Sequence, residues 1–277
     1  MKRLFLIIIL LCFGQANIGG YAIFDYKNTD GNGQFDINRA YFNYSTDVSD
    51  DLFFKFRLDV GRDPDGQDNK LSAYIKNVYV DWKAADKSSA FGNSKVSLGL
   101  IGANSYGVQE KNWGYRFIEK SLLDKYKMTN TADFGIGYSI KLSVLKLSVQ
   151  ILNGEGYKKT DSDGKQALYF SSVLGETNLS KNNGYNLGLI LNVLPPIDDD
   201  GDASALVGVF GGLSVPNWRC GVEYNTTNHS TQDPIEAISI SVNYALSDNL
   251  DLFVRNDSYK NPNENTDSSY QIIGAVW

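Results

Sequence analysis

Residues 103–131 combine an apolar stripe at helical spacing with a concentration of basic side chains. Intervals of three and four residues separate the members of the stripe, which are Tyr115, Ile118, Leu122 and Tyr126, and this spacing predicts a short amphipathic helix. The charges of the segment are Lys111, Arg116, Lys120, Lys125 and Lys127 against Glu110, Glu119 and Asp124, a net of +2 in a chain with a formal net charge of −6. Charges fixed beside a narrow water path act on dissolved ions through their electric field, without any bond being made. The chemistry predicted for this segment is therefore the electrostatic selection of small solutes.

A second group of charged residues alternates with apolar residues, so it is predicted to share one face of a sheet. Its basic members are Arg39, Lys55, Arg57, Lys146, Arg219 and Arg255, and its acidic members are Asp59, Asp81, Glu223 and Asp251. One interpretation joins Arg39, Lys55 and Arg57, on adjacent predicted strands, in a basic patch. The other pairs them with Asp59 and Asp81 in a filled polar interior. Both interpretations predict a polar lumen, because an Arg or Lys that faces lipid at the bilayer midplane costs about 2–4 kcal/mol.

The elements that must position these charges are strands in which every second residue is apolar. Leu145, Leu147, Val149 and Ile151 alternate with Lys146, Ser148 and Gln150, and residues 52–59, 238–244 and 250–255 show the same period. Noisier segments bring the total to about fourteen strands, within a range of about twelve to sixteen. The fold class predicted is all-β: a transmembrane, antiparallel, up-and-down β-barrel with one short helical loop folded toward the lumen.

The connections between the predicted strands fall into two alternating classes. Residues 47–51, 142–144 and 246–249 are short, whereas residues 27–34, 61–70, 154–166, 195–204, 226–234 and 260–268 are long and polar. Short periplasmic turns and long external loops are expected of outer-membrane barrels. The chain ends on an aromatic residue, Trp277, with Ala275 and Ile273 at alternate positions behind it. This pattern suits a closing strand that the barrel-assembly machinery recognises.

Several motifs lie on or beside these strands. They are Phe35-Asp-Ile-Asn-Arg-Ala-Tyr41, Asp51-Leu-Phe-Phe-Lys-Phe-Arg-Leu-Asp59, Gly114-Tyr-Arg-Phe-Ile-Glu-Lys-Ser121, Ala132-Asp-Phe-Gly-Ile-Gly137 and Leu152-Asn-Gly-Glu-Gly156. On these motifs the chain resembles, over residues 20–157 and its last strand, the outer-membrane porin family that includes the phosphate-selective porins O and P. The resemblance implies a water-filled channel, often trimeric, with a long loop folded inward as a constriction. Residues 103–131 follow the fifth predicted strand, where general porins place that loop. The alternative is an external loop helix that packs on a neighbouring subunit.

The N-terminus predicts export. Lys2 and Arg3 precede an apolar run over residues 4–13, and Gly14-Gln15-Ala16 supplies small residues for cleavage. Residues 1–16 are therefore predicted as a signal peptide and residues 17–277 as the barrel. Without Lys2 and Arg3 the net charge falls to −8, which argues against nucleic acid as a partner. The expected location is the cell outer membrane, among its lipid and lipopolysaccharide.

No cofactor, metal site or catalytic residue is predicted. Residues 28–36 and 198–202 look calcium-like but lack the spacing of an EF-hand, and glycine and aspartate are common in hairpin loops. The only histidine, His229, excludes a multi-histidine metal site and would have to serve any Ser/His hydrolase. The predicted function is passive diffusion of small hydrophilic solutes or ions through a porin, with selectivity set by residues 103–131 and the lumen charges. The alternatives are a non-conducting structural or adhesion barrel and a soluble secreted β-protein.

Overall fold

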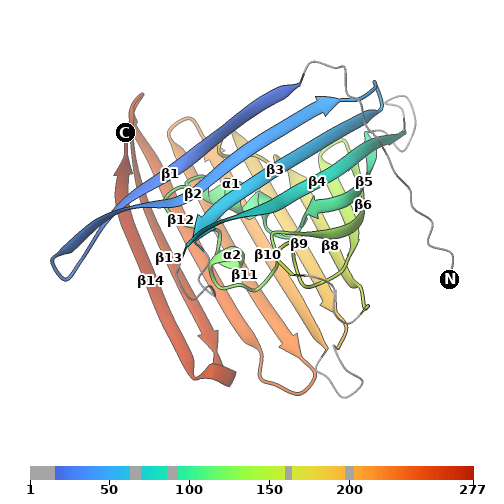
Figure 1. The fold of residues 1–277 in the computed structure, drawn as a ribbon. Helices are drawn as coiled ribbons and strands as arrows, with labels where there is room; N and C mark the ends of the chain where they lie inside the picture. Colours follow the sequence, from blue (N-terminus) through green and yellow to red (C-terminus); the bar gives the residue numbers. More distant parts are fainter. Residues whose placement is uncertain (1–15, 63–69, 86–92, 160–163, 197–202) are drawn as a thin grey trace. The chain divides into compact units, whose positions relative to one another are not determined.

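The computed structural model describes residues 16–62, 70–85, 93–159, 164–196 and 203–277. The regular elements of these residues are fourteen strands, two short α-helices and one 3-10 turn (Figure 1). The prediction of an all-β, antiparallel fold with about fourteen strands is confirmed. The predicted signal peptide, except for Ala16, falls outside the described residues, as do residues 198–202 and most of the predicted loop 61–70.

The chain divides into two compact units, residues 1–82 and residues 83–277. The strands of the first unit are β1 (Asn17–Thr29), β2 (Asn32–Asp47), β3 (Leu52–Arg62) and β4 (Leu71–Ala85), each paired antiparallel with the next. The prediction of a long loop over residues 27–34 is wrong, because β1 and β2 both run to a two-residue turn, Asp30-Gly31. Both turn residues have positive φ, 51° and 84°, which is the backbone that tight hairpin turns require and that Asp-Gly adopts readily.

The second unit holds ten strands in an up-and-down order. They are β5 (Ser94–Gly102), β6 (Ala132–Leu142), β7 (Leu145–Leu152), β8 (Ala167–Gly175), β9 (Gly184–Leu194), β10 (Ser204–Val215), β11 (Trp218–His229), β12 (Ile235–Ser247), β13 (Leu250–Asn261) and β14 (Thr266–Val276). Each pairs antiparallel with the next strand along the chain. The turns at residues 143–144, 216–217 and 248–249 have two residues each, and the 3-10 turn Pro262–Glu264 joins β13 to β14.

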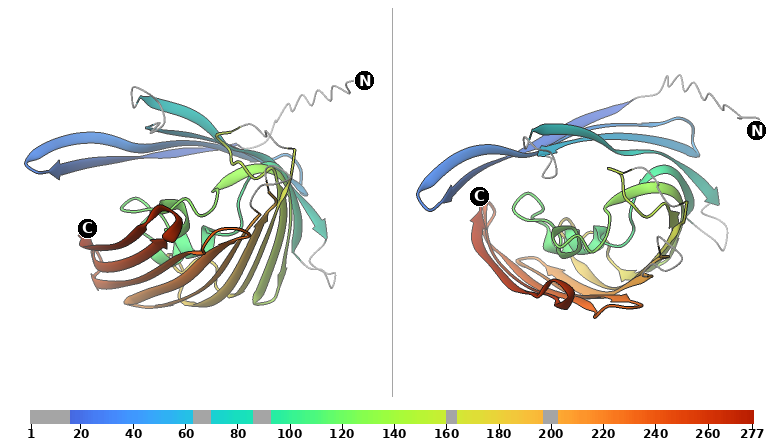
Figure 2. Two further views of the ribbon diagram at one scale, coloured as in Figure 1. Left: turned by 90° about the horizontal axis from the view of Figure 1, so that it is seen from below. Right: turned by 60° about the horizontal axis from the view of Figure 1, so that its bottom comes forward.

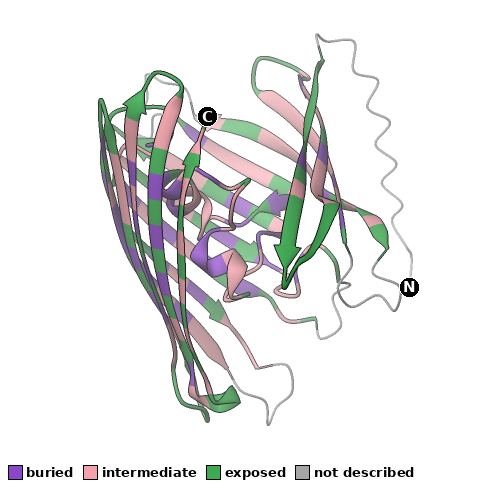
Figure 3. Ribbon diagram, turned by 90° about the vertical axis from the view of Figure 1, so that its left-hand side faces the viewer, coloured by how far each residue is buried: buried purple, intermediate pink, exposed green. Residues whose placement is uncertain are grey.

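One face of this curved sheet is apolar and exposed, and the other is polar and largely covered (Figure 3). On β12, Ile238 and Ile240 are 42% and 53% exposed, whereas the neighbouring Ser239 and Ser241 are 6% and 4% exposed. The alternation predicted from the sequence is therefore present in the folded strand. So large an apolar surface is stable against lipid and not against water.

Residues 103–131, between β5 and β6, contain the helices α1 (Gly107–Trp113) and α2 (Leu122–Lys125). The prediction of one helix through the stripe from Tyr115 to Tyr126 is wrong. Gly114 ends α1 in the left-handed conformation (φ 82°), and turns follow it as far as α2. Two members of the stripe are nevertheless buried, since Tyr115 is 6% and Leu122 0% exposed. No helix in the described part of the chain is long and apolar enough to cross a membrane.

Two of the sequence motifs meet where this segment rejoins the sheet. The carboxylate of Asp133 accepts hydrogen bonds from the N–H groups of Phe134 (2.8 Å) and Gly154 (2.6 Å). The Asn130 amide donates to the carbonyl of Gly154 (2.6 Å). Gly154 has a φ of 112°, a backbone conformation that side chains disfavour. These contacts fix the end of residues 103–131 to the turn that follows β7.

Candidate functional site

The candidate site is the segment 103–131, called the inner loop below, together with the polar sheet face beneath it. The loop lies inside the curve of the strands of its own unit (Figure 2). Its Leu123 packs in an apolar cluster with Val173, Ile190, Leu206 and Phe210. Earlier in the loop, Trp113 and Tyr115 pack on Phe253 of β13. The inner loop therefore covers the polar face from β8 to β13, and its partners belong to the same chain.

Two arginines that the sequence predicts in the lumen hold the backbone of the inner loop. Arg219 of β11 donates to the carbonyl of Trp113 (3.2 Å), at the end of α1. Arg255 of β13 donates to the carbonyl of Lys120 (2.6 Å), just before α2. The carbonyls of the last turn of a helix lack partners within the helix, so a guanidinium group is suited to the position at Trp113.

Two predicted lumen carboxylates hold the same loop through its donors. Asp251 of β13 accepts a hydrogen bond from the Tyr115 hydroxyl (2.7 Å). Glu223 of β11 accepts one from the N–H of Leu122, the first residue of α2. Charged groups of both signs on the sheet thus contact the loop.

Asparagine side chains, which the sequence did not single out, make the neutral contacts between loop and sheet. Asn112 of α1 and Asn186 of β9 exchange two amide hydrogen bonds of 2.9 Å each, and both are buried. Asn192 of β9 donates to the hydroxyls of Ser105 (3.2 Å) and Thr129 (3.0 Å), near the two ends of the loop. The loop is therefore fixed at its beginning, its middle and its end.

A pair of glycines makes room for α1 on the sheet. Gly212 of β10 lies directly opposite Gly221 of β11 in the strand register. A Cβ added to Gly212 would lie 2.7 Å from the amide nitrogen of Asn112, and one added to Gly221 would lie 3.2 Å from the Asn112 Cβ. The absence of both side chains lets the helix approach closely enough for the Asn112–Asn186 pair to form.

A buried charge cluster joins β13 to the second half of the loop. Asp257, 0% exposed, accepts hydrogen bonds from Arg255 Nε (2.8 Å) and Nη2 (2.9 Å) and from the Ser239 hydroxyl (2.7 Å). Lys125 of α2 approaches the same carboxylate (3.2 Å) and also Glu119 (3.8 Å). The sequence prediction missed Asp257, although its position two residues after Arg255 places it on the same face of the strand.

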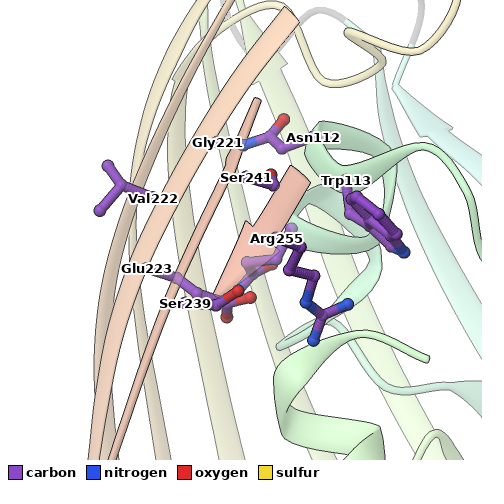
Figure 4. A pocket seen from close by; sticks show the side chains of 9 residues that line it. Asn112, Trp113, Gly221, Val222, Glu223, Ser239, Ser241 and Arg255 are labelled. Atoms are coloured by element: carbon purple, nitrogen blue, oxygen red, sulfur yellow. The ribbon is translucent and has the colours of Figure 1, made fainter. Parts of the chain in front are cut away.

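The gap between α1 and the sheet is small. It has room for about one water molecule and is lined from α1 by Gln109, Asn112 and Trp113 and from the sheet by Gly221, Val222, Glu223, Ser239, Ser241 and Arg255. Figure 4 shows Glu223 on the loop side of β11 and Val222 on the opposite side. Solutes larger than water therefore have no room beneath α1.

A larger polar cavity of about 160 Å³ lies at the short-turn end of the second unit. Tyr115 of the inner loop lines it, together with Arg219, Asp251 and residues 179–183 and 214–218. The polar face beside the loop is therefore accessible to small solutes at this end.

The charges of the inner loop separate into paired and water-facing groups. Arg116 pairs with Glu110 (3.1 Å) and with Asp124 (3.3 Å), and Lys125 pairs with Asp257. Within the part of the chain that the structure describes, no ion pair joins the three remaining basic residues of the loop to an acid; these are Lys111, Lys120 and Lys127. Lys111 and Lys127 are exposed. The net charge that the loop presents to water is therefore basic.

In the first unit, Arg39 forms an ion pair with a neighbouring carboxylate, that of Asp59. Its guanidinium lies 3.1 Å from Asp59, which is 0% exposed, and Lys76 lies 3.9 Å from the same carboxylate. Arg57 lies over the ring of Tyr41, with 5.6 Å from its Cζ to the ring centroid. The sequence left open a basic patch or internal pairing, and for Arg39 the geometry is that of internal pairing.

The other predicted lumen residues are placed by strand register. Lys55 of β3 lies opposite Tyr79 of β4, and Asp81 of β4 lies opposite Phe53. In the second unit Lys146 of β7 lies opposite Lys141 of β6. Residues directly opposite each other face the same side of a sheet. The two lysines therefore add to the basic character of the polar face.

Burial changes the pKa values of three groups in the inner loop. Burial, followed by the hydrogen bond to Asp251, raises the pKa of the Tyr115 phenol to about 12. Burial also raises the pKa of Tyr126. The pKa of Lys125 is lowered by burial, while the charges of Asp257 and Glu119 act in the opposite direction.

The exposed apolar strands, the polar inner face and the loop folded onto that face define a transmembrane β-barrel of the porin class. The family described as phosphate-selective porin O and P matches residues 14–182, and the chain belongs to this family. It is an outer-membrane porin, a channel for the passive passage of solutes. None of the curated protein sequences compared with the chain matches it.

Solved porin structures share the fold at low sequence identity. OmpF of Salmonella typhi, in complex with daunomycin, has a TM-score of 0.64 and 12% identity over 95% of this chain and 86% of that one. The trimer form of OmpT of Vibrio cholerae has a TM-score of 0.59 and 13% identity, covering 94% of this chain and 83% of that one. The anion-selective porin of Comamonas acidovorans has a TM-score of 0.57 and 11% identity, covering 94% and 84%. The likeness is one of fold.

Proposed function

We propose that the inner loop is the pore constriction and that its basic residues give this porin a preference for small hydrophilic anions. The observation that supports the proposal is the separation of the loop charges. The acids of the loop are engaged in ion pairs, whereas Lys111, Lys120 and Lys127 are not paired with acids in the described part of the chain. Positively charged side chains beside a narrow water path with walls of low dielectric constant attract dissolved anions and repel dissolved cations.

The exposed apolar outer face supports a proposal for the surroundings of the barrel. Outer-membrane lipid and lipopolysaccharide cover the exposed apolar residues, and the barrel-assembly machinery inserts the chain after removal of a signal peptide, residues 1–16. A homotrimer is the proposed assembly, since the OmpT structure that resembles this chain is a trimer form. Blue native electrophoresis of the folded protein tests the trimer, and N-terminal sequencing of the exported protein tests the cleavage after Ala16.

Catalysis is not part of the proposal. A hydrolase would have to use His229, at the end of β11, and the neighbouring Ser230 hydroxyl accepts a hydrogen bond from the N–H of Ala203 (3.2 Å). Among the described residues, no group of three or more His, Cys, Asp and Glu side chains is arranged to hold a metal ion.

Conductance of the pure protein in planar lipid bilayers tests the channel. Stable unitary current steps are expected, and their absence would support the alternative, a non-conducting structural or adhesion barrel. The reversal potential in a salt gradient tests the selectivity. Replacing either Lys120 or Lys127 by glutamine is expected to shift this potential toward cations. Lys260→Gln is the charge-matched control, because Lys260 is exposed at the outer end of β13. Equal reversal potentials for the loop variant and the control would remove the inner loop from the selectivity mechanism.

A further inference from the structure

Asp257 contacts a buried cation of the sheet, Arg255, and a half-buried cation of the inner loop, Lys125. We propose that Asp257 is a positioning residue of the constriction: it clamps the inner loop to β13 and, together with Glu119, removes the charges of Lys125 and Arg255 from the field of the pore. The role of the inner loop as a constriction rests on the proposed function. The attachment of the loop to β13 by Asp257 can be measured independently, without recording ion currents.

The clamp acts first through Arg255. Two nitrogens of this guanidinium bind the two oxygens of Asp257, at 2.8 and 2.9 Å. A bidentate pair fixes the plane of the guanidinium, and the remaining nitrogen Nη1 then donates to the carbonyl of Lys120 at 2.6 Å. Asp257 therefore determines the orientation of the group that holds the chain just before α2.

The clamp acts a second time through Lys125. Its Nζ lies 3.2 Å from Asp257 and 2.9 Å from the centroid of the Tyr270 ring on β14. The next loop residue, Tyr126, stacks on Tyr259 of β13, with ring centroids 4.3 Å apart and an interplanar angle of 4°. Residues 120–126 are thus tied to β13 and β14, and two of these contacts, through Arg255 and through Lys125, involve the carboxylate of Asp257.

The charges of the cluster show why that carboxylate is required. Arg255 and Lys125 are two cations near the three carboxylates of Glu119, Glu223 and Asp257, and Arg255 is only 1% exposed. Asp257 is the carboxylate that contacts both cations, so without its charge the repulsion between Arg255 and Lys125 acts in a poorly hydrated site, where it is weakly screened. Of the two cations, Lys125 is the one that can move, because it is on the loop and Arg255 is on a strand. Residues 120–126 then move away from the sheet, and the ammonium group of Lys125 enters the water path.

Hydrogen exchange of the folded protein in detergent micelles measures the clamp directly. In Asp257→Asn, amide exchange over residues 115–127 is expected to rise at least about ten-fold, because local opening of the loop becomes easier, while exchange in the strands is unchanged. Asp248→Asn is the charge-matched control, since Asp248 lies in the two-residue turn between β12 and β13. Exchange no faster than in the control, or a rise spread evenly over the strands, would overturn the proposal.

A double-mutant cycle tests whether Lys125 is the partner. In a Lys125→Met background, Asp257→Asn is expected to have less than about a third of its effect on exchange, because the repelled cation is absent. An undiminished effect would overturn the pairing. If Asp257→Asn does not fold, Lys125→Met alone tests the clamp from the loop side: faster exchange over residues 119–127 supports it, and wild-type exchange contradicts it.

Ion selectivity tests the second half of the proposal. Asp257→Asn is expected to increase the anion-to-cation permeability ratio at least about two-fold, because Lys125 then faces the water path. The variant K125M/D257N should return the ratio to that of the wild type, and a ratio that stays high would contradict the role of Lys125. If the wild-type protein does not conduct while the exchange results hold, the proposed function fails and the clamp stands.

Discussion

Substituting Gly212 by alanine tests whether the glycine pair on β10 and β11 seats α1. The new Cβ would lie 2.7 Å from the amide nitrogen of Asn112 and 2.6 Å from Cδ1 of Leu179. Favourable contacts between such atoms are about 3.5–4.0 Å, so α1 must move by about 1 Å. That movement breaks the two hydrogen bonds between Asn112 and Asn186, and buried polar groups left without partners cost about 1–3 kcal/mol. With the strain of overpacking, the expected loss in unfolding free energy is about 2–4 kcal/mol.

The neighbouring residue supplies a matched control. Gly211 lies on the opposite face of β10, where an added Cβ would lie 3.2 Å from Cδ2 of Leu187. Leu187 is 60% exposed and can move at little cost, so Gly211→Ala is expected to change the unfolding free energy by less than about 0.5 kcal/mol. Urea titration of both variants, folded in lipid vesicles, gives the two free energies. Equal stabilities, with equal hydrogen exchange over residues 107–113, would refute the seating of α1 by Gly212.

Other contacts of the inner loop make three further predictions. The difference between the alkaline absorbance titrations of wild type and Tyr115→Phe should show one phenol ionising near pH 12. Because this pKa is raised in the folded state, the phenol should stabilise the fold below pH about 10 and lose that contribution as the pH rises toward about 12; a difference titration centred near 10 would contradict the burial and the bond to Asp251. Asp133→Ala removes the acceptor of the Gly154 N–H and should lower the unfolding free energy by about 1–3 kcal/mol in urea titration, and an unchanged midpoint would argue against the contact. Arg116→Gln removes the cation that two loop acids share and should shift the reversal potential toward cations, so an unchanged potential would show that those acids do not face the pore.

The strands were predictable because their signal is local. In β12 every second side chain faces lipid, so the period of two is written into consecutive residues such as Ile238, Ser239 and Ile240. The hairpin tip of β1 and β2 was not predictable in the same way. Residues 27–34 are polar on both faces, which is the composition of a loop, yet their backbones pair up to Asp30-Gly31. Strand pairing needs no apolar side chains, and the pattern therefore underestimates the length of these strands.

The candidate site was predictable only in part, because its contacting residues are far apart in the sequence. Alternation was enough to assign Arg219, Asp251 and Arg255 to the polar face, because the side of a strand follows from parity. Their partners in the inner loop are more than a hundred residues away, and nothing local connects Tyr115 with Asp251, which are 136 positions apart. The helical spacing of the stripe was misleading as well, because Gly114 ends the helix before the stripe begins.

The positions of the paired charges change how selectivity in this porin should be understood. A count of charged residues on the polar face treats Arg255 and Lys125 as equal to Lys120, because all three are basic residues on or against that face. The structure separates them by what they contact: Asp257 and Glu119 together neutralise the first two, and no acid in the described part of the chain is paired with Lys120. The field in the water path depends on the charges that remain unneutralised, since a closely paired charge acts on a distant ion only as a dipole. Variants of Lys111, Lys120 and Lys127 should therefore change ion selectivity, whereas variants at Arg255 and Asp257 should change it only by moving the loop.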